Sequence, residues 1–166
     1  MKADTLRELY RGGRPNARAK DIQRRLMPLA RRGLVPFGAV LEVTGRTSGR
    51  TISLPVVVIR VAGEDYVVSM LGPTANWVRN LRADPRAVLH RGRRRAVRMV
   101  EVSAQEAAPV LWRYVRIARS GRVHMRVGPQ STRAELVAAA PDYPTFRIDS
   151  SAPAGGAAAA AGSSES

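Results

Sequence analysis

A short basic loop between two strand-like runs constrains this sequence more than any other feature. Residues 40–43 and 52–59 are rich in apolar and β-branched side chains, and the loop from Thr44 to Arg50 joins them. Its glycines permit a tight turn and leave backbone N–H groups accessible. Its hydroxyls can donate hydrogen bonds, and its guanidiniums can hold a phosphate or carboxylate in a bidentate manner. The loop therefore predicts an anion site, although a solvated hairpin tip with incidental arginines would explain the same residues.

The positive charge of the chain is large and unevenly distributed. The net charge is +15, and arginine accounts for 26 of the 28 basic residues. Residues 1–50 carry a net +8, residues 51–100 carry +6, and residues 101–166 carry only +1. Such a field attracts nucleic acid, an anionic membrane or a polyanionic small molecule, and charge alone does not choose among them.

Composition narrows the kinds of site that this chain can build. The absence of cysteine excludes disulfides and thiolate chemistry, and only His90 and His124 remain as nitrogen ligands, so we expect no metal centre. No apolar run reaches the roughly 20 residues that span a bilayer. The first eight residues lack the apolar core of a signal peptide. We therefore expect a soluble, cytoplasmic protein with a single domain.

The N-terminal region predicts a basic arm followed by an amphipathic helix. Residues 1–16 are polar and contain the breaker sequence Gly12-Gly13-Arg14-Pro15, so we expect a flexible arm. Residues 17–32 have helical spacing, and Gly33 is a plausible stop. The apolar positions of this helix are Ile22, Leu26, Met27, Leu29 and Ala30. The helix either packs on its own domain or lies at a membrane surface with its arginines on lipid headgroups.

The middle of the chain alternates strands with one short helix. Pro55 requires a strand edge, a bulge or a strand start, because proline lacks an N–H. Residues 65–70 follow as a third strand, and a helix capped by Thr74 or Asn76 runs to residue 83. Residues 86–90 and 95–103 predict a strand pair, with a bulge where the hydrophobic parity changes, joined by an arginine-rich turn that protects a sheet edge.

The C-terminal third predicts two helices and a closing strand. The helix at 104–119 should bury Ala107, Val110, Leu111, Tyr114, Val115 and Ala118. A loop follows from residue 120, and Thr132 with Glu135 predicts a capping box for a helix that reaches residue 140. Residues 145–149 predict the last strand, and the Ala/Gly/Ser tail from 150 to 166 should be disordered. The element order indicates a mainly β, α+β fold: a barrel of about six antiparallel strands with peripheral helices, spanning residues 17–149.

Two motifs in this order resemble one family of enzymes. They are Thr44-Gly-Arg-Thr-Ser-Gly-Arg50 before a hairpin, and Ser69-Met-Leu-Gly72 followed by Asn76-Trp-Val-Arg-Asn-Leu-Arg-Ala-Asp-Pro85. Together they resemble the deazaflavin-dependent nitroreductases and F420H2-dependent quinone reductases of actinobacteria, and the similarity extends over roughly residues 11–149. The resemblance implies a split β-barrel related to flavin-binding oxidoreductases, with coenzyme F420 as the hydride carrier. F420 has a flat deazaflavin ring and a tail that bears a phosphate and several carboxylates.

The resemblance also implies which residues bind this cofactor. The tail would lie on Arg46, Thr47, Ser48, Gly49 and Arg50, and the ring edge beside the backbone of Ser69, Met70, Leu71 and Gly72. Pro55, Asn76, Trp77 and Asn80 would complete the pocket. Many members have lysine where Thr47 stands, the loop after Ser69 is shortened here, and the tyrosine-rich helix of nitro-reducing members has no clear counterpart. No catalytic residue follows from the resemblance, and solvent, Ser69 and Tyr114 are the candidate proton donors.

The expected function is therefore an F420H2-dependent reductase that passes hydride to a quinone, an enone or a nitro compound, as a monomer or homodimer. The cofactor carries this chemistry, so no paired carboxylates or catalytic triad are required. One alternative is a barrel that binds FMN, haem or another planar anion without turnover. Another is nucleic-acid binding, which the 5% aromatic content makes less favourable because few stacking platforms exist. Trp77 could stack on a flat ring or pack in the core.

Overall fold

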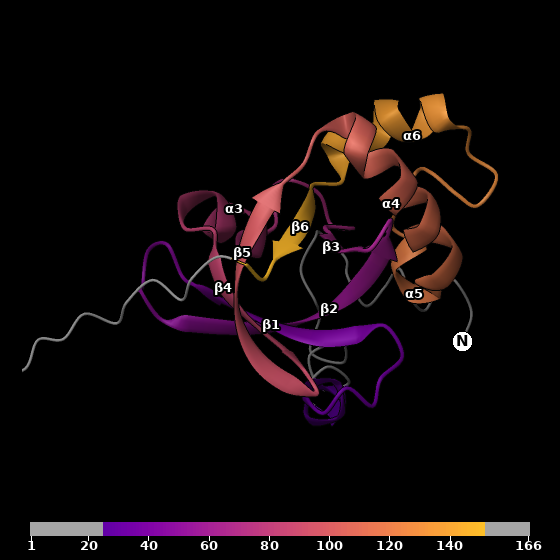
Figure 1. Cartoon of the computed structure of the whole chain (residues 1–166). Coiled ribbons are helices and arrows are strands. Elements are labelled where there is room, and N and C mark those ends of the chain that lie inside the picture. Colours follow the sequence, from indigo (N-terminus) through magenta and orange to yellow (C-terminus); the bar gives the residue numbers. More distant parts are fainter. Residues whose placement is uncertain (1–24, 152–166) are drawn as a thin grey trace, which may run out of the picture.

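The strands form a closed antiparallel barrel, with helices packed against its outside (Figure 1). The computed structural model describes residues 25–151, apart from the side chains of residues 119 and 120. The strand order is β1-β2-β3-β6-β5-β4, and β4 returns to pair with β1. The predicted fold class is confirmed. The expectations for the arm at 1–16, for residues 17–24 of the first helix and for the tail beyond 151 lie outside the described residues.

The strands are β1 (Gly38–Thr44), β2 (Thr51–Val61), β3 (Glu64–Val68), β4 (Arg86–Arg91), β5 (Arg93–Glu101) and β6 (Thr145–Asp149). The helices are α3 (Asn76–Ala83), α4 (Ala104–Ile117), α5 (Arg119–Arg122) and α6 (Arg133–Ala139), with the 3-10 turn η2 (Ala140–Asp142) after α6. Residues 25–31 form a further helical segment, called the N-terminal helix below. This order matches the sequence prediction, except that α5 occupies the start of an expected loop.

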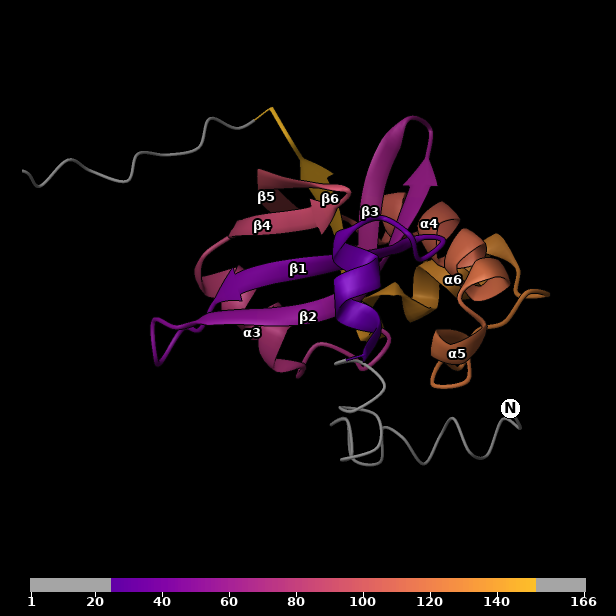
Figure 2. The same cartoon turned by 90° about the horizontal axis from the view of Figure 1, so that it is seen from below.

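β2 pairs with two different neighbours, which accounts for the proline inside it (Figure 2). Residues 51–57 pair with β1, and residues 58–61 pair with β3. Pro55 lies opposite Val40 of β1, in the half of β2 that pairs with β1 alone. A residue without an N–H is tolerated where one side of the strand is unpaired. Of the three situations that the proline allowed, a local strand edge is the one observed.

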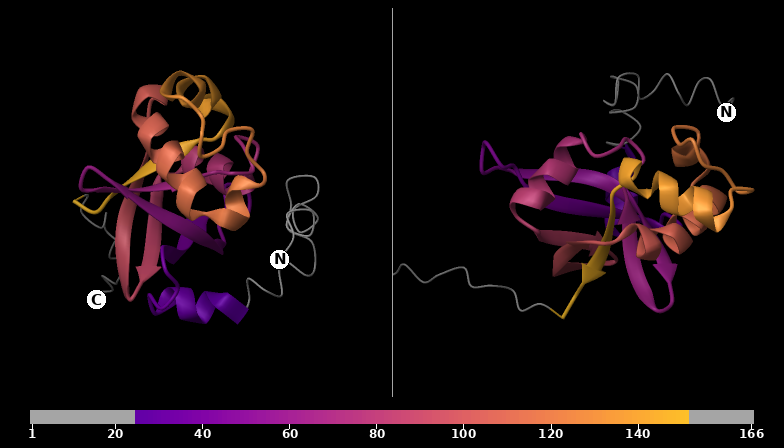
Figure 3. Two further views of the ribbon diagram at one scale, coloured as in Figure 1. Left: turned by 90° about the vertical axis from the view of Figure 1, so that its right-hand side faces the viewer. Right: turned by 90° about the horizontal axis from the view of Figure 1, so that it is seen from above.

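Two hydrophobic clusters hold the elements together. One fills the barrel around Leu41, Leu89 and Phe146. The other lies between the barrel wall and α4 and α6, which stack on one side of the barrel while the N-terminal helix lies on another (Figure 3). The six residues predicted to face inward from α4 or its end are all buried: Ala107, Val110, Leu111, Tyr114, Val115 and Ala118. The helical periodicity therefore identified this interface correctly.

β5 shows why hydrophobic parity can mislead. Val97 and Met99 belong to the barrel cluster, whereas Val102, just past the strand, packs against the outer cluster beside α4. The register of β5 with β4 and with β6 stays constant along both ladders. The change of parity arises because Val102 lies past the end of the strand and packs against the outer cluster, and no residue is inserted. The predicted bulge was wrong.

Of the predictions for the helix caps and the arginine-rich turn, one is confirmed and two are wrong. The capping box of α6 is confirmed, since Thr132 and Glu135 bond each other's backbone N–H groups. α3 instead begins after Ala75 without a side-chain cap, so the predicted caps at Thr74 or Asn76 were wrong. The arginine-rich turn, at Gly92, does not protect a sheet edge. Both β4 and β5 are strands of a closed barrel and have a paired strand on each side.

A half-buried carboxylate anchors the N-terminal helix on the barrel. Arg31 Nη2 donates to Glu42 Oε1 at 2.9 Å, and the Ser53 hydroxyl donates to the same atom at 3.3 Å. His90 Nε2 lies 3.1 Å from Glu42 Oε2, an ion pair when the imidazole is protonated. Burial acts to raise the pKa of Glu42, but His90 and Arg31 outweigh it and hold this pKa below its ordinary value of 4.5.

A carboxylate with a lowered pKa predicts acid sensitivity with a definite sign. The stabilisation from ionised Glu42 is fully present above its unfolded-state pKa of about 4.5 and is lost as the pH falls through its lower folded-state pKa. We expect Glu42→Gln to be less stable than wild type near neutral pH, with the difference shrinking below pH 4.5. Urea unfolding over this pH range measures the difference, and a gap that stays constant into acid would contradict this role.

Candidate functional site

The tip of the β1–β2 hairpin gathers hydrogen-bond donors on an exposed turn. Gly45 N–H donates to the Arg50 carbonyl and Gly49 N–H to the Gly45 carbonyl, both at 2.8 Å, which closes the turn. Gly49 has a φ of +65°, and the side chains from Arg46 to Arg50 are exposed. Gly45 is buried, and a Cβ there would lie 2.7 Å from Ser48 Oγ, so a larger residue would displace the Ser48 hydroxyl.

The backbone of this turn offers fewer free donors than the sequence suggested. The Arg46 N–H reaches Asn80 Oδ1 at 3.3 Å, and the Arg50 N–H reaches Ser48 Oγ at 3.3 Å. Within the described chain, the amides of Thr47 and Ser48 have no protein acceptor. The turn therefore presents two amides, two hydroxyls and the guanidiniums. This donor set fits a multiply charged anion such as a phosphate or a row of carboxylates.

A buried asparagine connects the hairpin tip to the second sequence motif. Asn80 of α3 is 2% exposed, and its Oδ1 accepts from both the backbone N–H and the guanidinium Nη1 of Arg46, the latter at 2.9 Å. A carbonyl oxygen that binds two donors of one residue restricts both its backbone and its side chain. Asn80 therefore holds Arg46 in place from 34 residues away in sequence. The expected pocket residue therefore positions the hairpin tip from Thr44 to Arg50, called the anion loop below after its proposed ligand.

The loop after β3 is braced from inside and leads into α3. The buried Ser69 donates its hydroxyl to the Gly72 carbonyl at 2.9 Å, and its backbone N–H bonds the Pro144 carbonyl at 2.9 Å. Gly72 has a φ of +88°, which favours glycine. Leu71 is half-buried, and Asn76 is exposed at the start of α3. In this arrangement the Ser69 hydroxyl stabilises the loop conformation.

Trp77 and Tyr114, the two aromatic residues that the sequence analysis singled out, pack in different hydrophobic clusters. Trp77 is half-buried with its ring centroid 5.6 Å from that of Phe146, so it packs against the barrel core. Tyr114 of α4 is buried, and its hydroxyl lies against Gly121 of α5. A Cβ on Gly121 would overlap that hydroxyl and would lie 3.0 Å from Met70 Sδ. Tyr114 is therefore brought close to the Ser69–Gly72 loop, whereas Pro55 stays in β2.

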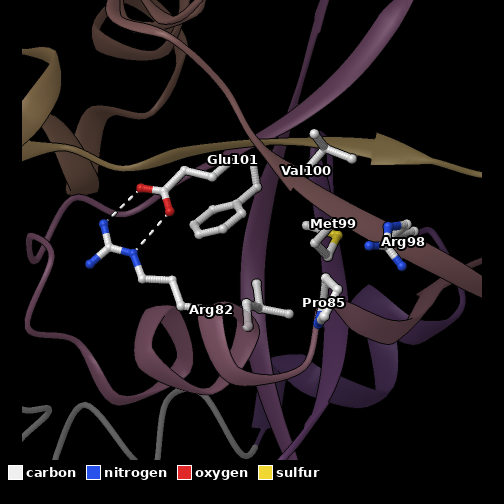
Figure 4. A pocket seen from close by; sticks show the side chains of 8 residues that line it. Arg82, Pro85, Arg98, Met99, Val100 and Glu101 are labelled. Carbon is white, nitrogen blue, oxygen red and sulfur yellow. Dashed lines mark hydrogen bonds and ion pairs between the residues drawn. The ribbon is translucent and has the colours of Figure 1, made fainter.

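Two cavities lie beside α3, outside the predicted residues. Their volumes are about 310 and 330 Å³, and both are lined by Arg82 and Glu101. These side chains form a bidentate ion pair at 2.7 and 2.9 Å (Figure 4). Sequence reasoning missed this pair, because it forms only when β5 is brought beside α3. No group of three or more metal-ligating side chains occurs in the described part of the chain.

Comparison with known proteins identifies the family. The family described as F420H(2)-dependent quinone reductase matches residues 21–142, well over half of the chain. The chain belongs to this family. Membership in the F420H(2)-dependent quinone reductase family supports an F420-dependent reductase, which is an oxidoreductase, in agreement with the resemblance of the two motifs. No curated protein matches the sequence.

One solved structure with a TM-score above 0.5 supports the fold at low sequence identity. The protein Atu2129 from Agrobacterium tumefaciens, described as of unknown function, matches with a TM-score of 0.52 and 15% identity, covering 77% of this chain. The present chain spans 55% of that protein's length. An F420-H2 dependent reductase, FDR-A, gives a TM-score of 0.48 at 14% identity over 68% of this chain and 94% of its own. A heme binding protein from Mycobacterium smegmatis gives a TM-score of 0.49 at 14% identity. The match covers 72% of this chain and 48% of that protein.

The Arg46–Asn80 contact predicts a specific loss of order at the anion loop. We expect Asn80→Ala to lower the free energy of unfolding by about 1–3 kcal/mol, because two donors lose their shared acceptor. Amide hydrogen exchange at Arg46 should accelerate. Asn76→Ala changes the same residue type on the same helix at an exposed position, and should stay within about 0.5 kcal/mol of wild type. Equal effects of the two substitutions would contradict the anchoring role.

The close approach of α5 to α4 predicts a strong dependence on residue size at position 121. Gly121→Ala should destabilise the fold by about 1–3 kcal/mol, because the new methyl group overlaps the buried Tyr114 hydroxyl. In a Tyr114→Phe background that oxygen is absent, so the same substitution should cost less. A double-mutant cycle by urea unfolding measures the coupling. A coupling of zero would show that this approach does not occur in solution.

Proposed function

We propose that this protein binds reduced coenzyme F420 and directs hydride transfer to a small organic acceptor, of the quinone, enone or nitro class. Family membership supports the cofactor class. The observation that carries the proposal is the exposed cationic hairpin tip held by Asn80, because its donors suit a tail of phosphate and carboxylate groups.

The hairpin tip is the part of the chain that would hold the cofactor's tail. Arg46 Nη1 donates a hydrogen bond to Asn80. This bond restricts the orientation of the exposed guanidinium before a ligand binds. A donor that is already ordered loses less conformational entropy on binding. Arg50 adds a second exposed guanidinium, and the Thr47 and Ser48 hydroxyls and amides add neutral donors. Without the lysine that many members carry at position 47, arginines supply all the positive charge of this turn.

The loop from Ser69 to Gly72 would lie along the ring. When bound, the reduced deazaflavin supplies the hydride, and the protein contributes binding, orientation and exclusion of water. The Ser69 brace holds the loop backbone in one shape, while Met70 and Tyr114 provide an apolar wall. Because the hydroxyls of Ser69 and Tyr114 are both buried, we propose that solvent supplies the proton that completes reduction of the acceptor.

Equilibrium binding tests the tail site directly. Arg46→Ala should weaken binding of F420 by roughly 10-fold to 150-fold, which corresponds to about 1.5–3 kcal/mol for a lost charge-assisted hydrogen bond. Fluorescence quenching of the cofactor measures the affinity. Arg133→Ala is the matched control, since it removes an exposed arginine from α6, on the opposite side of the molecule from the hairpin tip (Figures 1 and 2).

Each outcome of that titration is decisive. Loss of affinity in Arg46→Ala but not in Arg133→Ala supports the assignment. Equal affinities of wild type and Arg46→Ala would contradict the tail site. A parallel titration with FMN distinguishes the cofactor, because FMN has only a single phosphate and no carboxylate tail. Tighter binding of FMN than of F420 would overturn the proposed cofactor while leaving the fold assignment intact.

A further inference from the structure

The exposed large apolar side chains of this protein are concentrated in one stretch. Six occur in the described part of the chain, and four of them lie between residues 26 and 37. These four, called the apolar ridge below, are Leu26 at 45% exposure, Leu29 at 42%, Leu34 at 65% and Phe37 at 44%. Single exposed apolar residues are normal, so the concentration of four within residues 26–37 indicates an interaction surface.

Phe37, at the end of the ridge, is exposed and has a strained backbone conformation. Phe37 has a φ of +59°, in the left-handed region that a bulky residue rarely adopts. The Gly38 N–H bonds the Val35 carbonyl at 2.9 Å, and the Val58 N–H bonds the Phe37 carbonyl at 2.7 Å, which maintains this conformation. Strained backbone of this kind is concentrated at functional sites.

A basic turn is fixed beside the ridge. The turn between β4 and β5 carries Arg91, Arg93 and Arg94, all exposed, around Gly92; we call it the arginine turn. The Gly92 N–H donates to the Arg31 carbonyl at 2.9 Å, and a Cβ on Gly33 would lie 3.1 Å from the Gly92 nitrogen. Figures 1 and 3 show the β4–β5 turn and the N-terminal helix at the same end of the molecule.

Among the described residues, no carboxylate forms an ion pair with the arginine turn. Residues 25–37 and 86–98 contain no Asp or Glu. Glu42, which anchors the N-terminal helix, is paired with Arg31 and His90. The surface thus combines exposed guanidiniums with exposed aliphatic and aromatic groups. Nucleic acid would match the positive charge but not the apolar ridge, whereas the headgroup region of an anionic bilayer matches both.

We propose that the apolar ridge and the arginine turn together dock this protein on the surface of an anionic lipid bilayer. The apolar side chains enter the boundary between headgroups and acyl chains, and the guanidiniums bind lipid phosphates. None of the described helices is long and apolar enough to cross a membrane, so the contact is at the surface. The docking does not depend on the proposed reductase chemistry, and its test needs no cofactor.

Co-sedimentation of the full chain with vesicles tests the proposal. We expect binding to phosphatidylcholine vesicles that contain phosphatidylglycerol, little binding to phosphatidylcholine alone, and weakening with added salt. The double variant Arg93→Gln/Arg94→Gln should lose roughly fivefold in affinity for each arginine. The variant Leu34→Ser/Phe37→Ser should also bind several-fold more weakly. Both change exposed side chains, and circular dichroism checks that they fold.

Two matched controls separate this surface from the general attraction of a cationic protein. Arg113→Gln/Arg133→Gln removes the same charge from α4 and α6, and Trp112→Ser removes an exposed apolar side chain from α4. Both should bind the anionic vesicles as wild type does. If the controls lose as much affinity as the surface variants, or if wild type does not bind at all, the proposal is overturned.

A fluorescent residue reports whether the ridge enters the lipid. Phe37→Trp should give a blue-shifted emission with anionic vesicles, beyond any shift of the wild-type protein, and brominated lipids should quench it. An unchanged spectrum would overturn insertion. Sedimentation velocity without lipid tests the other occupant: a dimer that Leu34→Ser/Phe37→Ser dissociates, together with no vesicle binding, would assign this surface to a second copy of the chain.

Discussion

The hydrogen bonds on both sides of β1 are the constraint on which the rest of the structure depends. β1 pairs with β2 on one side and with β4 on the other, and this second pairing closes the barrel. Its inward side chains, such as Leu41, belong to the barrel core. Its outward Glu42 anchors the N-terminal helix, and its end runs directly into the anion loop. One strand thus connects the core, the proposed cofactor site and the proposed membrane surface.

The two proposed surfaces are attached to this framework by different kinds of contact. The anion loop is an exposed turn that the buried side-chain amide of Asn80 links to α3. The apolar ridge depends on backbone contacts between glycine-containing turns, where Gly33 and Gly92 approach closely. At the first surface, the side chain of Asn80 determines where Arg46 is held. At the second, the close approach of Gly33 and Gly92 determines where the arginine turn is held. The abundance of arginine alone does not determine this position.

The candidate site was predictable where motif chemistry is local and unpredictable where it depends on packing. The hairpin donors from Arg46 to Arg50 could be named from residue types, because a glycine-containing turn between two strands must lie at a tip. The role of Asn80 could not, since the amide of an asparagine fits a pocket wall as well as a buried hydrogen bond. The burial of the Ser69 hydroxyl and the ion pair of Arg82 with Glu101 likewise follow from how β3, β5 and α3 meet.

The sequence by itself determined the strands, the inward face of α4 and the capping box of α6, because each rests on periodicity or on contacts within a few residues. It also determined that a turn rich in arginine and hydroxyl groups separates β1 from β2. Tertiary structure alone decided that the barrel closes and that β5 continues without a bulge, because Val102 packs beside α4 only after the strand has ended. It also decided that the arginine turn lies against the N-terminal helix. These features join residues far apart in the chain, and their geometry exists only once the sheet has curved and its two ends have paired.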